Sequence, residues 1–172
     1  MGQWQDFFKK WVNRDIGFRM TEEMSGTHRY SRDYAPGNVD AGVELPLEVK
    51  ITWGSPKMEE FLNPSHGRFL CADLEGSISA GGLCTQAPIK GTLELRYFKD
   101  ATLRYCFYFL AHERQFRYLG EKREIRPWNV HRTHTTCYGT ITEVASNEIL
   151  SESVIYFNLQ DLPRFLGSFR FD

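Results

Sequence analysis

The chain has 172 residues and a formal net charge of -1 at pH 7, with 41% hydrophobic and 25% charged residues. Such values are typical of one soluble globular domain, and a chain that is not basic overall lacks the electrostatic basis for binding nucleic acid. Segment 96–132 differs, since it holds nine Lys and Arg against four Asp and Glu. It suits an anionic head group or an acidic partner, or else forms the solvated outer faces of strands.

The first predicted elements are a helix, a strand and a second helix. Aromatic residues at helical spacing predict an amphipathic helix over 3–12. In 43–53 apolar residues alternate with polar ones, which predicts a strand with one wet face. Pro46, on the polar side, indicates an edge position or a bulge. The stretch "SPKMEEFL" predicts a short helix over 56–62, because Ser and Pro favour a helix start.

Strands dominate the rest of the chain, and most of them are joined by short turns. The predicted strands are 16–30, 43–53, 69–80, 89–98, 102–111, 115–125, 132–143 and 149–159. No helical pattern is long enough to cross over between parallel strands, so the sheet is mainly antiparallel. Eight such strands most easily close into a lipocalin-like (calycin-like) barrel, which leaves no exposed edge. We therefore predict one all-β domain over 1–172, with barrel strands in 16–159 and a short C-terminal helix at 160–168.

Two features of the strands bear on what surrounds and fills the barrel. The strand "LRYCFYFL" (103–110) is apolar on both faces, which predicts that the terminal helices cover its outer side. Four glycines, each followed by Ser or Thr, lie within predicted strands: Gly26, Gly76, Gly91 and Gly139. Glycine inside a strand indicates either barrel curvature or room for a ligand.

The segment "NVHRTHTTCYGTITE" resembles a metal site, because His131, His134 and Cys137 recur every three residues. On a strand His134 faces away from the other two. His131 and Cys137 would lie about 20 Å apart along the strand, which zinc bonds of about 2.0–2.3 Å do not span. We therefore predict a strand with no metal.

Nucleophile and cofactor motifs are not found: there is no GxSxG, P-loop or GxGxxG sequence. His112 beside Glu113 is predicted to be solvated in a hairpin turn. We predict no catalytic residue and no cofactor.

Cysteine usage and the first residues of the chain bear on its location. The four cysteines form no CxxC pair, which indicates reduced, packed thiols. The opening "MGQWQDFFKKWV" lacks the apolar core of a signal peptide. No run reaches the about 18 apolar residues of a membrane span. These features predict a cytoplasmic protein without a transmembrane segment.

Several polar residues interrupt otherwise apolar or aromatic strand faces, namely Glu22, His28, Lys122, Thr136 and Tyr138. Inside a barrel such groups would form a network or meet the polar end of a ligand. The alternative is that they point outward into water.

Four short motifs together resemble a known accessory domain: "GFRMTEEMSG" (17–26), "LRYCFYF" (103–109), "YLGEK" (118–122) and "WNVHRTHTTCYGTI" (128–141). That domain is found with GMC-type, cholesterol-oxidase-like oxidoreductases and with some α/β-hydrolases of lipid metabolism. The match spans most of the chain after residue 16, and its motifs mark strands rather than chemistry. His134 departs from the small or apolar residue expected there. The resemblance implies a stand-alone module that meets sterols, fatty acyl groups or other apolar molecules, without the enzymes' own activity.

These patterns predict a non-catalytic barrel that binds an apolar small molecule (a lipid, fatty acyl group or sterol-like compound) and presents it to, or shelters it for, a separate oxidoreductase or hydrolase. The predicted lining is Phe107, Phe109, Leu93, Leu95, Leu74 and Ile78, with His28 or Lys122 as the polar anchor. One alternative is a filled barrel that docks a partner enzyme through an apolar outer face together with the basic segment 96–132. Another is a small isomerase or hydratase that uses a buried histidine or acid. A cavity of about 300 Å³ or more would favour ligand binding over docking.

Overall fold

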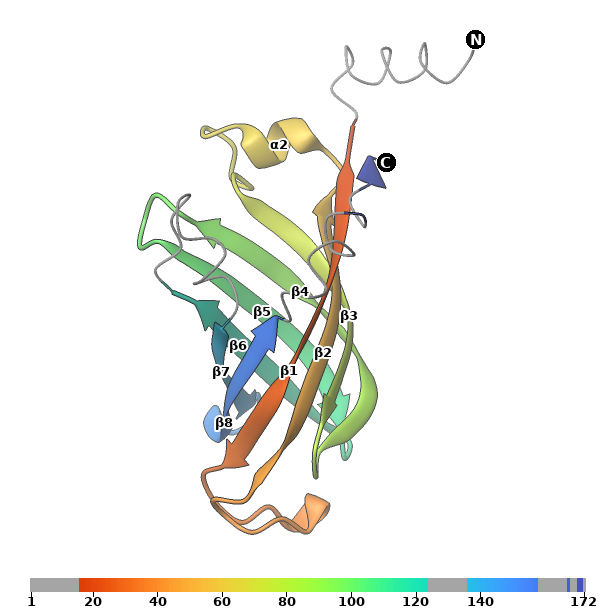
Figure 1. Ribbon diagram of the computed structural model, residues 1–172, viewed down its shortest axis with the longest axis vertical. Helices are drawn as coiled ribbons and strands as arrows, with labels where there is room; N and C mark the ends of the chain where they lie inside the picture. Colours follow the sequence, from red (N-terminus) through yellow and green to blue (C-terminus); the bar gives the residue numbers. More distant parts are fainter. Residues whose placement is uncertain (1–15, 124–135, 158–166, 168–169, 172) are drawn as a thin grey trace.

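The computed structural model describes residues 16–123, 136–157, 167, 170 and 171 (Figure 1). Its strands are β1 Phe18–Tyr30, β2 Glu44–Ser55, β3 Cys71–Ala80, β4 Cys84–Arg96, β5 Thr102–Ala111, β6 Arg114–Lys122, β7 Thr136–Glu143, β8 Glu148–Phe157 and β9 Arg170–Phe171. Two short helices, η1 (Ala35–Gly37) and α2 (Met58–Leu62), join strands. The predicted helix at 3–12 lies outside the described residues, as does the one at 160–168 apart from Gly167.

The eight long strands close on themselves. Each pairs antiparallel with its neighbours in the order β2-β3-β4-β5-β6-β7-β8-β1, and β1 pairs again with β2. The two-residue strand β9 adds to the start of β1, opposite Phe18 and Arg19. The prediction of an all-β, mainly antiparallel eight-stranded barrel is therefore confirmed.

The turn between β5 and β6 shows how local sequence sets the register. His112 and Glu113 have φ angles of 48° and 60° between the paired residues Ala111 and Arg114. Two left-handed residues in a two-residue loop match the twist of the flanking strands. Both side chains are exposed, as the sequence predicted for this pair.

Strand β5 corrects one prediction. Its inward residues Tyr105, Phe107 and Phe109 are buried, but on the outer face Tyr108 is 41% exposed and Leu110 is 70% exposed. The prediction that both faces are covered is wrong. The barrel interior accepts only one face of each strand, and separate apolar side chains on a protein surface are commonplace.

Of the two roles predicted for the four strand glycines, the structure favours curvature with close packing. A Cβ atom added at Gly26, Gly76 or Gly91 would lie 2.2, 2.0 or 1.9 Å from a backbone oxygen of the neighbouring strand. At Gly139 it would lie 2.3 Å from Oη of Tyr118. The volume left by these missing side chains is thus occupied by protein, and the alternative of ligand space at the glycines is not supported.

The two ends of the barrel differ. The segment with η1 lies at the lower end of Figure 1. Tyr34, the residue before η1, stacks on Tyr30 with ring centroids 5.6 Å apart. At the upper end, beside α2, the last described pair of the ladder between β1 and β8 is Met24 and Phe157, and β1 itself begins at Phe18.

Candidate ligand-binding site

All eight residues predicted as ligand contacts have side chains that face the barrel interior, and all but the partly buried Leu95 are fully buried: Phe107, Phe109, Leu93, Leu74, Ile78, His28 and Lys122. They are spread along the barrel. Leu95 pairs with Leu103, which pairs with Lys122, so these residues lie toward the upper end. His28 pairs with Leu45 and Ser153 toward the lower end. The structure does not bring the two candidate anchors together, and the role of the eight residues in binding stays a prediction.

The polar strand residues divide between the two faces. Glu22, His28 and Lys122 are buried inside the barrel, whereas Tyr138 is exposed on the outside and Thr136 is partly buried. The expectation that such residues face water is therefore right for Tyr138 and wrong for the three buried ones.

Glu22 and Lys122 form an ion pair inside the barrel. Lys122 Nζ donates to Glu22 Oε2 over 3.2 Å, and the two side chains are only 4% and 5% exposed. Tyr105 donates its hydroxyl proton to the other oxygen, Glu22 Oε1, over 2.6 Å. Each carboxylate oxygen thus accepts a hydrogen bond. A buried charge pair of this kind is costly to desolvate, which makes it weak evidence for a purely stabilising role.

Within the described part of the chain, the ammonium group of Lys122 uses only some of its donors. It lies 5.2 Å from the ring centroid of Tyr105 and 5.8 Å from that of Phe157, close enough for cation–π attraction. An ammonium group has three N–H donors. Among the described residues, Glu22 is the one hydrogen-bond acceptor of Lys122. The remaining donors can serve an oxygen atom of a ligand.

His28 is bonded at both ring nitrogens. Nε2 donates to the carbonyl oxygen of Gly81 and Nδ1 accepts from Oγ of Ser151, each over 3.1 Å. Burial lowers the pKa of His28, so the neutral ring of this tautomer is favoured. Both ring nitrogens of His28 already have hydrogen-bond partners in the lower barrel. Lys122 is therefore the better candidate of the two for binding the polar end of a ligand.

The other buried titratable groups near the pair are neutral. Burial raises the pKa of Cys137 to about 12, and its Sγ lies 3.9 Å from Oη of Tyr118, which also contacts Ser153 Oγ at 3.2 Å. Burial, and then Glu22, raises the pKa of Tyr105 well above its ordinary value, so its hydroxyl remains a donor. A neutral buried thiol is neither a good nucleophile nor a metal ligand.

Metal chemistry finds no support in the described residues. They contain no group of three His, Cys, Asp or Glu side chains placed to hold a metal ion. Cys137 faces the interior, and His131 and His134 lie outside the described residues.

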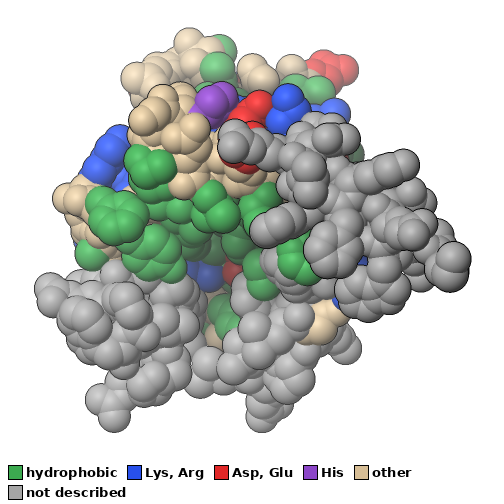
Figure 2. Space-filling view, turned by 90° about the horizontal axis from the view of Figure 1, so that it is seen from above, with side chains coloured by type: hydrophobic (Ala, Val, Ile, Leu, Met, Phe, Trp, Pro, Cys, Tyr) green, Lys and Arg blue, Asp and Glu red, His purple; other side chains and the backbone are tan. Residues whose placement is uncertain are grey.

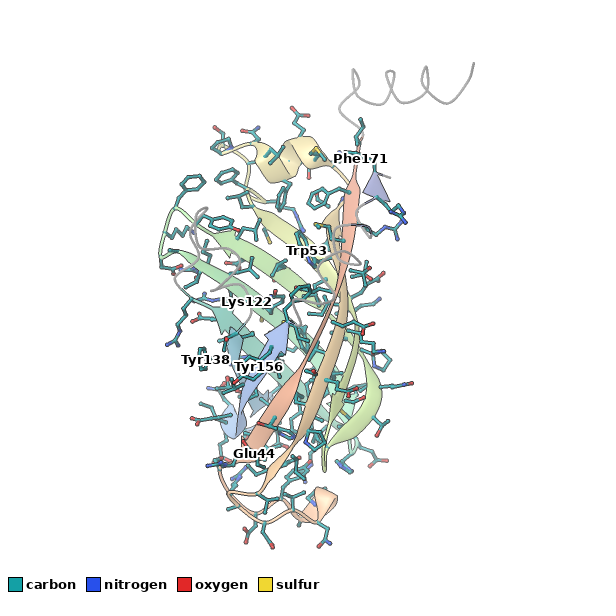
Figure 3. The ribbon with its side chains drawn as sticks, viewed as in Figure 1. Glu44, Trp53, Lys122, Tyr138, Tyr156 and Phe171 are labelled. Atoms are coloured by element: carbon teal, nitrogen blue, oxygen red, sulfur yellow. The ribbon has the colours of Figure 1, made fainter. Side chains whose placement is uncertain are left out.

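Above the ion pair lies what we call the mouth, defined by the inward-facing residues Met20, Trp53 and Leu95. All three are partly exposed, whereas Ile51 and Leu93, one inward step lower, are fully buried. Figure 2 looks onto this end and shows apolar side chains gathered there. In Figure 3 Trp53 lies nearer to α2 than Lys122 does. The mouth is therefore an apolar, partly exposed end of the barrel interior, with the buried ion pair beneath it.

Trp53 adds a second donor at the mouth. Its indole nitrogen is buried and has no hydrogen-bond partner among the residues that the structure describes, although buried N–H groups are normally bonded. Two further buried polar atoms without a partner, Tyr34 Oη and Arg117 Nε, lie away from the mouth, at the lower end and on β6. Trp53 also packs edge-on against Phe18, with ring centroids 5.9 Å apart.

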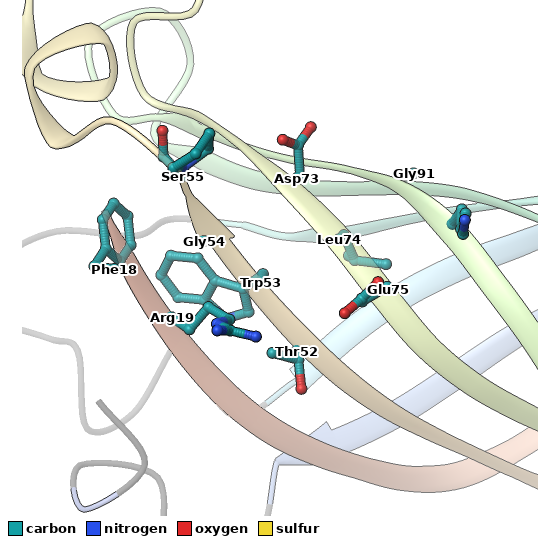
Figure 4. Close-up of a pocket in the computed structure, with 12 residues that line it drawn as sticks. Phe18, Arg19, Thr52, Trp53, Gly54, Ser55, Asp73, Leu74, Glu75 and Gly91 are labelled. Carbon is teal, nitrogen blue, oxygen red and sulfur yellow. The ribbon is translucent and has the colours of Figure 1, made fainter. Parts of the chain in front are cut away.

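Open hollows lie along the described part of the barrel. One of about 470 Å³ runs over β1–β4 and is lined by Phe18, Trp53 and Leu74 together with charged residues such as Glu75 (Figure 4). A second of about 500 Å³ lies over β6–β8 and β1, beside Tyr138, and a third of about 400 Å³ lies near the β4–β5 turn. Their volumes exceed the size that favours ligand binding, but they open to solvent along the wall and rim. Of the three, the first reaches Trp53.

Sequence reasoning did not select Trp53, Tyr105 or Phe157, which complete the site. Tyr105 shares strand parity with Phe107, so its inward direction could have been read from the pattern. Its bond to Glu22 could not, because the two residues are 83 positions apart.

Comparison of the chain with protein-family models, with curated proteins and with solved structures found no match. Among the described residues, no helix is both long enough and apolar enough to cross a membrane.

Proposed function

We propose that this protein binds an apolar small molecule at the mouth of its barrel, without catalysing a reaction, and that Lys122 holds the polar end of that molecule. The observation that carries the proposal is the buried ammonium group of Lys122, which has a single acceptor, Glu22, among the described residues. Leaving donors of a buried charged group unmet costs free energy, so an oxygen atom brought by a ligand would be bound favourably.

The apolar part of the ligand would pack against the mouth. Met20, Trp53 and Leu95 are partly exposed there, and Leu103 and Phe157 are buried close to Lys122. Lower in the barrel, Tyr118 and the aromatic residues of β5 fill the interior. A lipid, fatty acyl or sterol-like molecule with one polar end would match the polarity of this end of the barrel, which is apolar at the mouth and polar at the ion pair below it.

The ion pair itself argues against a catalytic role. An isomerase or hydratase would need a free base in the site, and among the described residues Glu22 is the one carboxylate paired with Lys122. Both oxygens of Glu22 accept hydrogen bonds, from Tyr105 and Lys122. A carboxylate engaged in this way is a poor general base.

The first test is native mass spectrometry of the purified protein, followed by organic extraction and identification of any bound compound. A stoichiometric apolar compound, and saturable binding of a neutral dye that fluoresces in apolar surroundings, would support the proposal. The double variant Glu22→Leu/Lys122→Met should keep an apolar, packed floor but lose the polar anchor, so it should lose binding. His28→Gln changes a buried polar residue at the other end of the barrel and is the control, which should keep binding. A protein without bound compound that fails to bind dye, sterol or long-chain alcohol would overturn the proposal.

The resemblance to the accessory domain suggests how such binding would be used. If the barrel belongs with GMC-type oxidoreductases or lipid-related hydrolases, it would present an apolar substrate to a separate enzyme or shelter it. Transfer of the extracted compound to such an enzyme, with and without the barrel protein, would test this role.

Docking of a partner enzyme is the second candidate function, and one observation favours it. On the outer face of β7 and β8, Tyr138 is 51% exposed and Tyr156 is 52% exposed, and Tyr138 borders the hollow of about 500 Å³ (Figure 3). Exposed aromatic residues are enriched where proteins bind one another. A photo-cross-linker at position 138 should then capture one defined enzyme that a cross-linker at Tyr108, on another wall, does not capture.

A further inference from the structure

We infer that the mouth selects a neutral ligand with a hydrogen-bond-accepting oxygen, such as an alcohol, ketone or ester, over the carboxylic acid with the same apolar chain. This inference rests on the proposed function and narrows its ligand class. It follows from the charge balance around Lys122.

The positive charge of Lys122 is already balanced by a negative charge. Lys122 contributes one positive charge and Glu22 one negative charge, and their atoms are 3.2 Å apart with both side chains buried. Among the described residues that face the upper half of the lumen, these are the two charged ones. The donors that remain on Lys122 can therefore bind an oxygen atom, but no surplus positive charge remains to balance a second carboxylate.

An anionic ligand would face two costs at this site. Its carboxylate would leave water for an apolar mouth, and it would lie near the negative charge of Glu22. A hydroxyl or carbonyl oxygen meets neither cost and can accept from Lys122. Among the described residues Nε1 of Trp53 has no acceptor, and the oxygen of a neutral ligand can supply one. Trp53 therefore adds binding to a neutral ligand, while the charge selectivity comes from the ion pair.

The selectivity should appear in a matched pair of ligands. We expect a long-chain alcohol to bind on the order of tenfold or more tightly than the fatty acid of the same length at pH 7.5, since burial of an unbalanced charge outweighs one hydrogen bond. Displacement of the neutral dye by each ligand measures the ratio.

Replacement of Glu22 by Gln should reverse the preference. Gln can still accept the Tyr105 proton, but Lys122 then lacks its counter-ion, so the fatty acid carboxylate becomes the favoured partner. Glu23→Gln is the matched control, because Glu23 is the next residue on β1, lies exposed beside Lys50, and its loss changes the net charge of the chain equally. The control should keep the preference of the unaltered protein.

The possible outcomes are distinct. Alcohol preference that reverses in Glu22→Gln alone supports the inference. Equal or tighter binding of the acid by the unaltered protein overturns the inference and leaves the proposed function standing, and this comparison holds even if Glu22→Gln does not fold. Absence of binding by both ligands overturns the proposed function and the inference with it.

Discussion

Two regions of the barrel bury titratable side chains in opposite ways. Around His28 the histidine is neutral, and each ring nitrogen is bonded, to Ser151 and to Gly81. Around Lys122 the buried group is a cation with one acceptor among the described residues, Glu22. The first arrangement is complete without a ligand, whereas the second still has donors to offer. Burial of a polar group alone therefore does not mark a binding site, and the unmet donors at Lys122 are the additional observation that the His28 end lacks.

The largest expected effect comes from breaking the ion pair on one side. Lys122→Met leaves the Glu22 carboxylate buried without its counter-ion, and we expect the free energy of unfolding to fall by about 3–5 kcal/mol. Denaturant titration measures this. Lys50→Met, which breaks the exposed pair with Glu23, should change stability by no more than about 1 kcal/mol.

The double variant separates stability from binding. With Glu22→Leu and Lys122→Met together, no buried charge remains, so stability should return to that of the unaltered protein or exceed it. Ligand binding should not return. A double variant as unstable as Lys122→Met would show that the pair is needed for folding itself, which would weaken the functional argument.

The second-largest effect on stability tests whether side chains fill the lower barrel. Gly139→Ala places a methyl group against the Tyr118 ring and hydroxyl, and we expect a loss of about 1–3 kcal/mol from overpacking. Gly67→Ala is the control, because a Cβ there meets nothing within 4 Å. If Gly139→Ala were as stable as the control, Tyr118 would have free space beside it, and the lower barrel would be able to hold a ligand.

The third effect is a pH dependence at the His28 end. Burial lowers the pKa of His28 in the folded protein below its ordinary value of 6.5. As the pH falls through 6.5 the unfolded chain therefore binds a proton first, and the free energy of unfolding decreases. His28→Gln should remove this part of the slope in denaturant titrations between pH 7.5 and 5. A slope unchanged in His28→Gln would assign the titration to another group.

Much of the fold follows from local pattern. The alternation in β2 and the two-residue turn at His112 and Glu113 each act within a few residues, and they predict strand, face and hairpin correctly. The charge pair could not be predicted in this way. Glu22 and Lys122 lie 100 positions apart, and they meet because β1 and β6 face each other across the closed barrel. Parity indicates which side of a strand a residue takes, but the partner depends on strand order and stagger.

The sequence pattern also does not predict which outer faces of the strands are covered. Leu110 is as apolar as its inward neighbour Phe109, and no local signal distinguishes a covered face from an exposed one. Gly139 is similar, since its role depends on the Tyr118 ring from the neighbouring strand. Tertiary packing decides both, which is why the prediction for the outer face of β5 was wrong.

Among these variants we expect Trp53→Phe to have the smallest effect on stability. It also tests whether the mouth offers a second donor besides Lys122. Phenylalanine keeps an aromatic ring beside Phe18 and removes a buried N–H that has no acceptor. Removal of an unmet donor relieves a desolvation cost, so stability should stay within about 1 kcal/mol or rise slightly. Ligand affinity should nevertheless fall by about three- to tenfold if a ligand oxygen accepts from the indole.

Tyr105→Phe provides the contrast for Trp53→Phe. It also removes one polar atom from an aromatic residue, but that hydroxyl donates to Glu22. Its loss should reduce stability by about 1.5–3 kcal/mol, as for a hydrogen bond to a charged group. If Trp53→Phe were as destabilising as Tyr105→Phe, the indole N–H would have an acceptor within the protein. The mouth would then offer Lys122 alone to a ligand, and its binding capacity would shrink to a single anchoring contact.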